Sequence, residues 1–138
     1  MAILNSFKRR KLNIWKTYTW RIRLYSDNIS PDYDLDPSTL TEITDPGYSP
    51  IQLTLSAIQE DLNEVYLEII NSPEFTYNRI TSVYLAAVTM DDGVDEVIYN
   101  LVNPNITPLV SGSDPISIEG DIKIKWSIYY IVKLTEKY

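Results

Sequence analysis

Residues 18–25 read Tyr-Thr-Trp-Arg-Ile-Arg-Leu-Tyr, with a large apolar side chain at every second position. These regularly spaced residues are Tyr18, Trp20, Ile22 and Leu24. Successive side chains of a β-strand point to opposite faces, so this spacing predicts a strand with one face in a hydrophobic core. Tyr25 would lie on the opposite face from Leu24, where an outward aromatic ring is typical of an interface.

The same alternation recurs along the rest of the chain. Further strands are predicted over residues 51–55, 65–69, 80–90, 94–102 and 116–132, with a turn or bulge at Gly120 inside the last run. Asp91-Asp92-Gly93 is a hairpin signal between two of them. Residues 56–63 could form a short helix, but two strands joined by a turn are favoured. Six to eight short strands indicate an all-β fold, an antiparallel two-sheet sandwich or jelly roll.

The last run also places two aromatic residues. Trp126 falls on its inward face, together with Tyr130, and Tyr129 falls on its outward face. We therefore expect Trp126 in the core and Tyr129 in an interface.

Residues 27–50 contain four prolines among Asp, Ser and Asn residues, a composition typical of a long loop that crosses between strands. Within it, Asp36 can cap a single helical turn that has Pro37 at its first position. Gly47 could supply a turn that needs a positive φ angle.

Residues 1–15 are predicted to form an extended, basic N-terminal arm, ordered on docking, and residues 16–138 a β-sandwich domain. The arm contains Lys8, Arg9, Arg10 and Lys11. Its apolar residues Leu12, Ile14 and Trp15 match neither the helix period nor the strand period.

The composition excludes several classes of enzyme and site. The chain has 138 residues, enough for one domain with a core of its own, and it has neither cysteine nor histidine. Disulfides, thiolate zinc sites and Ser-His or Cys-His catalytic pairs are therefore absent. No apolar run is long enough to span a membrane, and the first residues do not form a secretion signal, so synthesis in the cytoplasm is expected.

Charge is distributed unevenly along the chain. Seven of the twelve cationic residues lie within the first 23 positions, whereas residues 24–121 contain eighteen acidic side chains and the single cation Arg79. Segments of opposite sign suit docking between copies of the chain or on a charged partner, although a solvated surface would have the same composition.

The residues suggest four other kinds of site. The clusters Asp32/Asp34/Asp36 and Asp91/Asp92/Asp95/Glu96 could bind calcium, but solvated turn carboxylates explain them better. The basic arm and nearby aromatic residues could bind nucleic acid, but the acidic body would repel phosphates. Exposed Tyr and Trp side chains would also suit a carbohydrate-binding module, and paired carboxylates only weakly suggest glycoside hydrolysis.

The sequence thus predicts no enzyme, no catalytic residue, no cofactor and no metal site. It predicts instead a set of partner-binding residues. These are Lys8, Arg9, Arg10, Lys11, Trp15, Tyr25 and Tyr129.

Two regions of the chain resemble a family of small proteins encoded by tailed bacteriophages. The first comprises residues 23–31, Arg-Leu-Tyr-Ser-Asp-Asn-Ile-Ser-Pro, and residues 40–48, Leu-Thr-Glu-Ile-Thr-Asp-Pro-Gly-Tyr. The second comprises residues 84–99 around the turn Asp91-Asp92-Gly93, and residues 112–118. The resemblance covers about residues 20–126 and consists of turns and strand patterns.

The resemblance implies a virion-associated β-sandwich protein with no catalytic residue among the matched positions. The leading interpretation is a capsid decoration or cement protein that binds between major capsid subunits, with other virion proteins as partners and with self-association into a homo-oligomer. Its location would be the virion. A tail, neck, baseplate or fibre-attachment component would suit the same fold.

Overall fold

The protein is described from a computed structural model that covers residues 4–30, 34–61, 64–71, 73–102, 116–119, 123–125 and 133–136. Within these residues the chain forms ten β-strands, one α-helix and one 3-10 turn. Every strand pair is antiparallel. The predicted all-β, antiparallel, sandwich-like class is confirmed.

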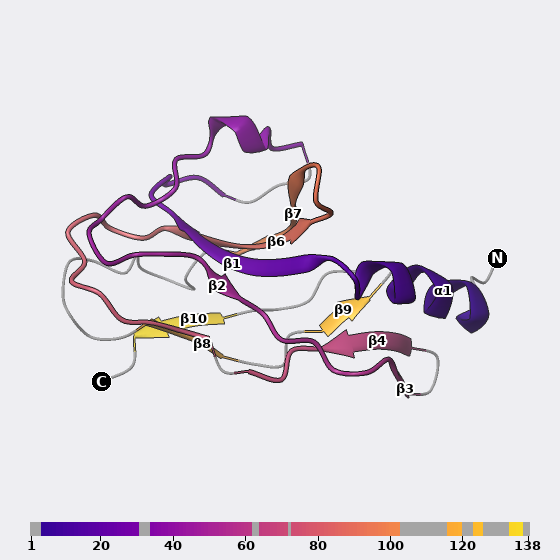
Figure 1. Ribbon diagram of the computed structural model, residues 1–138. Coiled ribbons are helices and arrows are strands. Elements are labelled where there is room, and N and C mark those ends of the chain that lie inside the picture. Colours follow the sequence, from indigo (N-terminus) through magenta and orange to yellow (C-terminus); the bar gives the residue numbers. More distant parts are fainter. Residues whose placement is uncertain are drawn as a thin grey trace.

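The strands form one larger and two smaller sheets (Figure 1). The elements of the N-terminal half are α1 (Asn5–Trp15), β1 (Thr19–Tyr25), η1 (Pro37–Thr39), β2 (Ile51–Gln52), β3 (Gln59–Asp61) and β4 (Glu64–Glu68). Those that follow are β5 (Glu74–Phe75), β6 (Leu85–Asp91), β7 (Glu96–Val102), β8 (Ile116–Glu119), β9 (Lys123–Lys125) and β10 (Lys133–Glu136). The sheet orders are β2-β1-β6-β7, β10-β8-β5 and β3-β4-β9.

Strand β1 lies in the middle of the four-stranded sheet and pairs with β6 over its whole length, from Thr19↔Asp91 to Tyr25↔Leu85. Its alternating pattern determines its two faces. Trp20, Ile22 and Leu24 are buried, as predicted. The intervening residues face the other side of the sheet, where the site described below is formed.

The main core lies between the four-stranded sheet and the layer made by the two smaller sheets (Figure 1). It is one continuous cluster, and it includes residues from all three sheets. Its buried members are Leu12, Trp20, Ile22, Leu24, Ile43, Leu53, Val65, Leu67, Phe75, Tyr77, Val83, Ala86, Val88 and Ile116.

The outer face of the four-stranded sheet has a second, smaller apolar cluster, formed by Tyr25, Leu85 and Ala87. Leu40 of the crossing loop packs against it. The prediction that Tyr25 is an exposed aromatic residue is therefore wrong: only 8% of it is exposed, because the loop folds back over this face.

The crossing loop follows the predicted turn chemistry. The Asp36 side chain accepts a hydrogen bond from the Ser38 N–H at the start of η1, which begins at Pro37. Gly47 has a φ angle of 88°. The loop is fastened to β1 by Tyr48, whose hydroxyl accepts a hydrogen bond of 2.9 Å from the Leu24 N–H.

The remaining strand predictions have mixed outcomes. Residues 56–63 were predicted as the turn between two strands, but Gln59–Asp61 within them form β3, which pairs with β4, so this prediction is corrected. The hairpin of β6 and β7 is confirmed. The strand predicted over residues 51–55 is shorter, since β2 ends at Gln52 and Leu55 forms only an isolated bridge.

The last predicted run divides between sheets. β8 pairs with β5 and β10, whereas β9 pairs with β4, so the two strands do not continue a single sheet. Trp126 and Tyr129 lie outside the described residues.

The extended arm predicted for residues 1–15 is corrected by the structure, because Asn5–Trp15 form α1. Leu12 is fully buried in the main core, and the helix contacts β4. The segment has no glycine or proline, and Leu12 and Trp15 lie three residues apart on one helical face, where they pack against the body.

Candidate partner-binding surface

The exposed side of α1 carries a stripe of large side chains. Leu4, Phe7, Lys11 and Ile14 follow one another at intervals of three or four residues, which places them along one side of the helix. The exposed fractions are 69% for Leu4 and 45% for both Phe7 and Ile14. The Lys11 Nζ lies 5.8 Å from the centre of the Phe7 ring. We call these four residues the α1 stripe.

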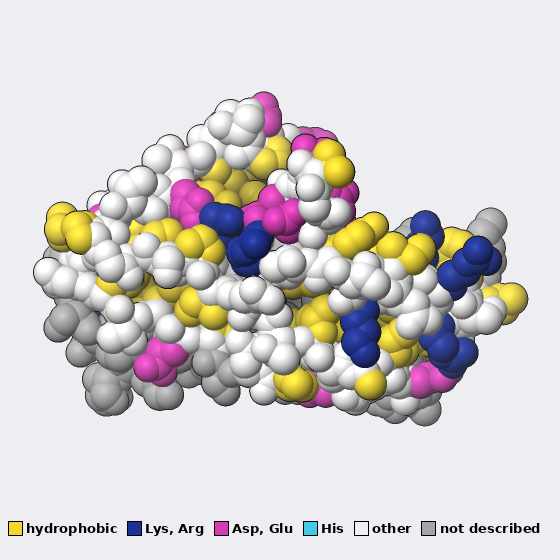
Figure 2. Space-filling model, viewed as in Figure 1, with side chains coloured by type: hydrophobic (Ala, Val, Ile, Leu, Met, Phe, Trp, Pro, Cys, Tyr) yellow, Lys and Arg dark blue, Asp and Glu magenta, His cyan; other side chains and the backbone are white. Residues whose placement is uncertain are grey.

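Cationic side chains surround the α1 stripe (Figure 2). Arg9 pairs with Glu60 of β3, and the Asn5 side-chain amide donates to the same carboxylate at 2.9 Å. Arg10 and Lys16 are exposed and form no ion pair with any residue that the structure describes. The helix therefore presents uncompensated positive charge next to exposed apolar area.

Trp15, predicted as a partner-binding residue, has its ring inside the molecule. The ring lies 6.1 Å from the ring of Trp20 and 6.1 Å from that of Tyr99 in β7, measured between centroids. The Trp15 carbonyl accepts a hydrogen bond of 2.9 Å from the Trp20 indole N–H. These contacts fix the end of α1 on the four-stranded sheet, and they leave Trp15 half-buried rather than available as a flat platform for a sugar.

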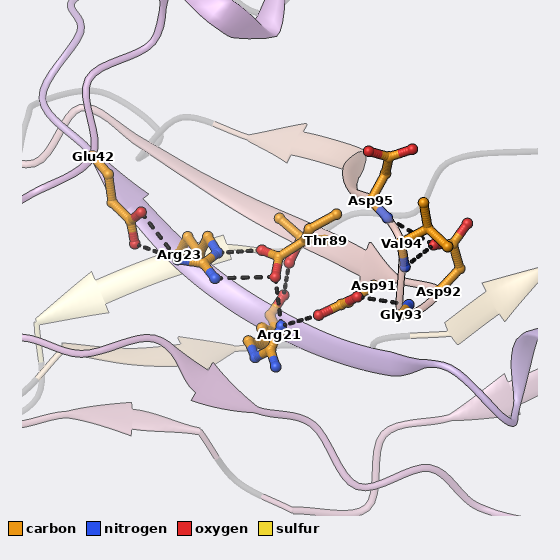
Figure 3. Close-up of polar contacts among 10 residues, drawn as sticks. Arg21, Arg23, Glu42, Thr89, Asp91, Asp92, Gly93, Val94 and Asp95 are labelled. Carbon is orange, nitrogen blue, oxygen red and sulfur yellow. Dashed lines mark hydrogen bonds and ion pairs between the residues drawn. The ribbon is translucent and has the colours of Figure 1, made fainter.

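A second group of charges lies on the outer face of the four-stranded sheet (Figure 3). Arg23 donates from Nη1 to both Glu42 oxygens at 3.0 Å, and it also pairs with Glu96 through Nε and Nη2. Arg21 pairs with Glu96 and, at 3.0 Å, with Asp91. We call these five residues the β1 ion network.

The β1 ion network sets two cations against three carboxylates. Burial opposes ionisation of Glu96, but hydrogen bonds from Arg23 and Thr89 together hold the pKa of its carboxyl below the ordinary value. Hydrogen bonds to Glu96 and Glu42 raise the pKa of Arg23. Glu96 is thus held in its ionised form, paired with Arg23.

The acidic side chains at the β6–β7 turn mainly accept hydrogen bonds from the backbone of the turn itself. Asp91 accepts a hydrogen bond from the Gly93 N–H, and Asp92 accepts from the N–H groups of Val94 and Asp95, all at 2.9 Å. These bonds lower the pKa of Asp91 and Asp92. Among the described residues no group of three or more acidic side chains is arranged to hold a metal ion.

The structure thus brings together only part of the predicted site. Lys8, Arg9, Arg10 and Lys11 share α1, whereas Tyr25 is buried on the outer face of the sheet. The apolar members of the α1 stripe were missed. Their spacing is a helical signal, but it is visible only if the window begins at Leu4 rather than at Lys8.

Comparisons with family models, with curated proteins and with solved structures found no match to this chain. No helix among the described residues has the length and apolar character needed to cross a membrane.

Proposed function

We propose that this chain is a non-enzymatic structural protein that binds a protein partner through the α1 stripe and the cations beside it. The observation that carries the proposal is the exposure of Leu4, Phe7 and Ile14 on a helix whose other side is held in the core by Leu12. Apolar side chains gathered on one rigid surface commonly mark an interaction site.

The partner should offer an apolar groove with acidic residues at its rim. Covering the α1 stripe would remove apolar area from water at about 25 cal/mol per Å², and Arg10 and Lys16 would steer the approach. A helix laid into such a groove is a common mode of recognition. Nucleic acid fits less well, because a net charge of −7 would repel phosphates everywhere except at α1.

The specific form we propose is a virion protein, most simply a capsid cement protein that binds between major capsid subunits. This step depends on the sequence resemblance to small phage proteins. A compact β-sandwich with one projecting docking helix suits such a role, and it would also suit a tail, neck or baseplate component.

Binding to undecorated capsid shells tests the proposal. The variant Phe7→Ser/Ile14→Ser should keep its fold and no longer co-sediment with shells. The control Ile70→Ser/Ile80→Ser removes two isoleucines that are more exposed, at 62% and 66%, from outside α1 and should bind normally. Equal binding by the two variants would contradict the role of α1.

Electron cryomicroscopy of purified virions tests the location. Density for this chain between capsid subunits, with α1 against a neighbour, would support the cement role. Density in the tail would favour the alternative, and a particle without the chain would contradict the virion proposal altogether.

A further inference from the structure

The C-terminal end of α1 lies near the turn between β6 and β7 (Figure 1). Thr19, four residues after the end of α1, pairs with Asp91 at the end of β6. The contact between the rings of Trp15 and Tyr99 connects the helix to β7 as well. Figure 2 shows dark blue side chains of the helix and magenta side chains of the turn on one face, with yellow side chains between them.

The tip of this turn has the opposite character to α1. Val94 is 87% exposed and lies between Asp92 and Asp95, and we call these three residues the hairpin tip. The Asp95 carboxylate makes no interaction with any described residue, and Figure 3 shows it pointing away from the β1 ion network. The hairpin tip thus presents an apolar side chain flanked by negative charge.

We propose that one partner of the α1 stripe is the hairpin tip of a second copy of this chain. The inference deepens the proposed function and rests on it. Both surfaces combine exposed apolar side chains with charge of one sign, and the signs are opposite: residues 1–26 contain no acidic side chain, and residues 91–96 contain no cation. Val94 would pack on the α1 stripe, and Asp95 would face Arg10 or Lys16.

A twofold arrangement of the two copies would close the pair. When the hairpin tip of one copy meets the α1 stripe of another, a twofold axis brings the second tip to the second stripe. The two contacts then reinforce each other, because each one orients the molecules for the other. The product is a symmetric dimer rather than an open chain of copies.

Cross-linking tests the contact. Because the chain has no cysteine, only the introduced cysteines can react. Ile14→Cys and Val94→Cys are placed in separate, differently tagged chains and mixed with a short bismaleimide. The link between them should form at least about tenfold faster than the link between Ile14→Cys and Ile80→Cys, a control position 66% exposed. Equal rates in the two mixtures would overturn the proposed contact.

Sedimentation equilibrium of the unaltered chain tests the assembly. A dimer is expected whose dissociation constant rises with salt and rises about tenfold in Arg10→Glu. A monomer at every concentration would overturn the inference. If that monomer bound shells and the Phe7→Ser/Ile14→Ser variant did not, the proposed function would stand without the dimer. If the unaltered chain formed a dimer and the Phe7→Ser/Ile14→Ser variant still bound shells, the dimer would support the inference. The shell binding would contradict the α1 stripe as the docking surface for shells.

Discussion

Arg21 and Arg23 in β1 and the cations of α1 lie within the same short stretch of sequence, yet the molecule uses them differently. The side chains of Arg23 and Glu96 are each 22% exposed and are joined by two hydrogen bonds. Arg10 and Lys16 are exposed, with no ion pair among the described residues. The cations of the strand form ion pairs within the protein, whereas Arg10 and Lys16 face solvent.

The difference shows that a count of charges along the sequence is not a map of surface charge. The first 23 residues contain seven cations, but Arg21 and Arg23 are neutralised by acidic residues from the body of the protein. Because some acidic side chains of the body are paired with these arginines, the body has fewer unpaired carboxylates than its composition suggests. Substitutions in β1 should therefore change stability, and substitutions in α1 should change binding.

The largest expected effect is that of Arg23→Ala. The substitution leaves Glu42 and Glu96 without their shared cation, and we expect the free energy of unfolding to fall by about 2 kcal/mol. Urea denaturation of the two proteins measures the change. An unchanged midpoint would show that the network makes no net contribution to stability, as is common for exposed ion pairs.

Acid should weaken the same network by a smaller amount. The folded pKa of Glu96 lies below its ordinary value near 4.5, so its contribution is fully present above that value and is lost as the pH falls through the folded pKa. The loss stays below that in Arg23→Ala, because a protonated carboxyl still accepts hydrogen bonds. Urea midpoints measured from pH 6 to pH 3 test this. In Arg23→Ala the urea midpoint should depend less steeply on pH over this range.

Tyr48→Phe should lower the free energy of unfolding by a smaller amount, about 1 kcal/mol. The hydroxyl accepts from the Leu24 N–H and donates to Glu42 at 2.7 Å, so it connects the crossing loop to the β1 ion network. The ring and its contacts with Phe75 and Tyr77 would remain. Thermal unfolding followed by circular dichroism gives the change, and a loss as large as that of a core truncation would show that the ring itself had moved.

Arg10→Ala should have the smallest effect on stability, within about 0.5 kcal/mol, because the side chain is exposed. Its effect should be seen in shell binding and self-association instead. Destabilisation by Arg10→Ala equal to that by Arg23→Ala would remove the distinction between the two groups of cations.

The β fold could be predicted because its signals are local. The alternation in residues 18–25, the turn at Asp91-Asp92-Gly93 and the cap at Asp36 each depend on neighbouring residues, and each is found in the structure. The division of the last run between two sheets depends on which earlier strands are available for pairing, and that information is not contained in the run itself.

The candidate site was less predictable for the same reason. Lys8, Arg9, Arg10 and Lys11 identify a basic segment, but the helix becomes evident only through the packing of Leu12 against residues far along the chain. The β1 ion network joins Arg23 to Glu42 and Glu96, which are nineteen and seventy-three positions away. Tyr25 obeys the predicted alternation, yet the loop that covers it could not be placed from local sequence.

The pairing of β1 with β6 has a consequence for the order in which the chain acquires structure. β1 is synthesised early, but its hydrogen-bonding partner, residues 85–91, follows about sixty positions later. Until then only the two-residue strand β2 can pair with β1. Folds dominated by such distant pairings form slowly, on the scale of milliseconds to seconds, and their intermediates tend to aggregate. During synthesis the apolar face of β1 is thus the part of the chain most in need of protection.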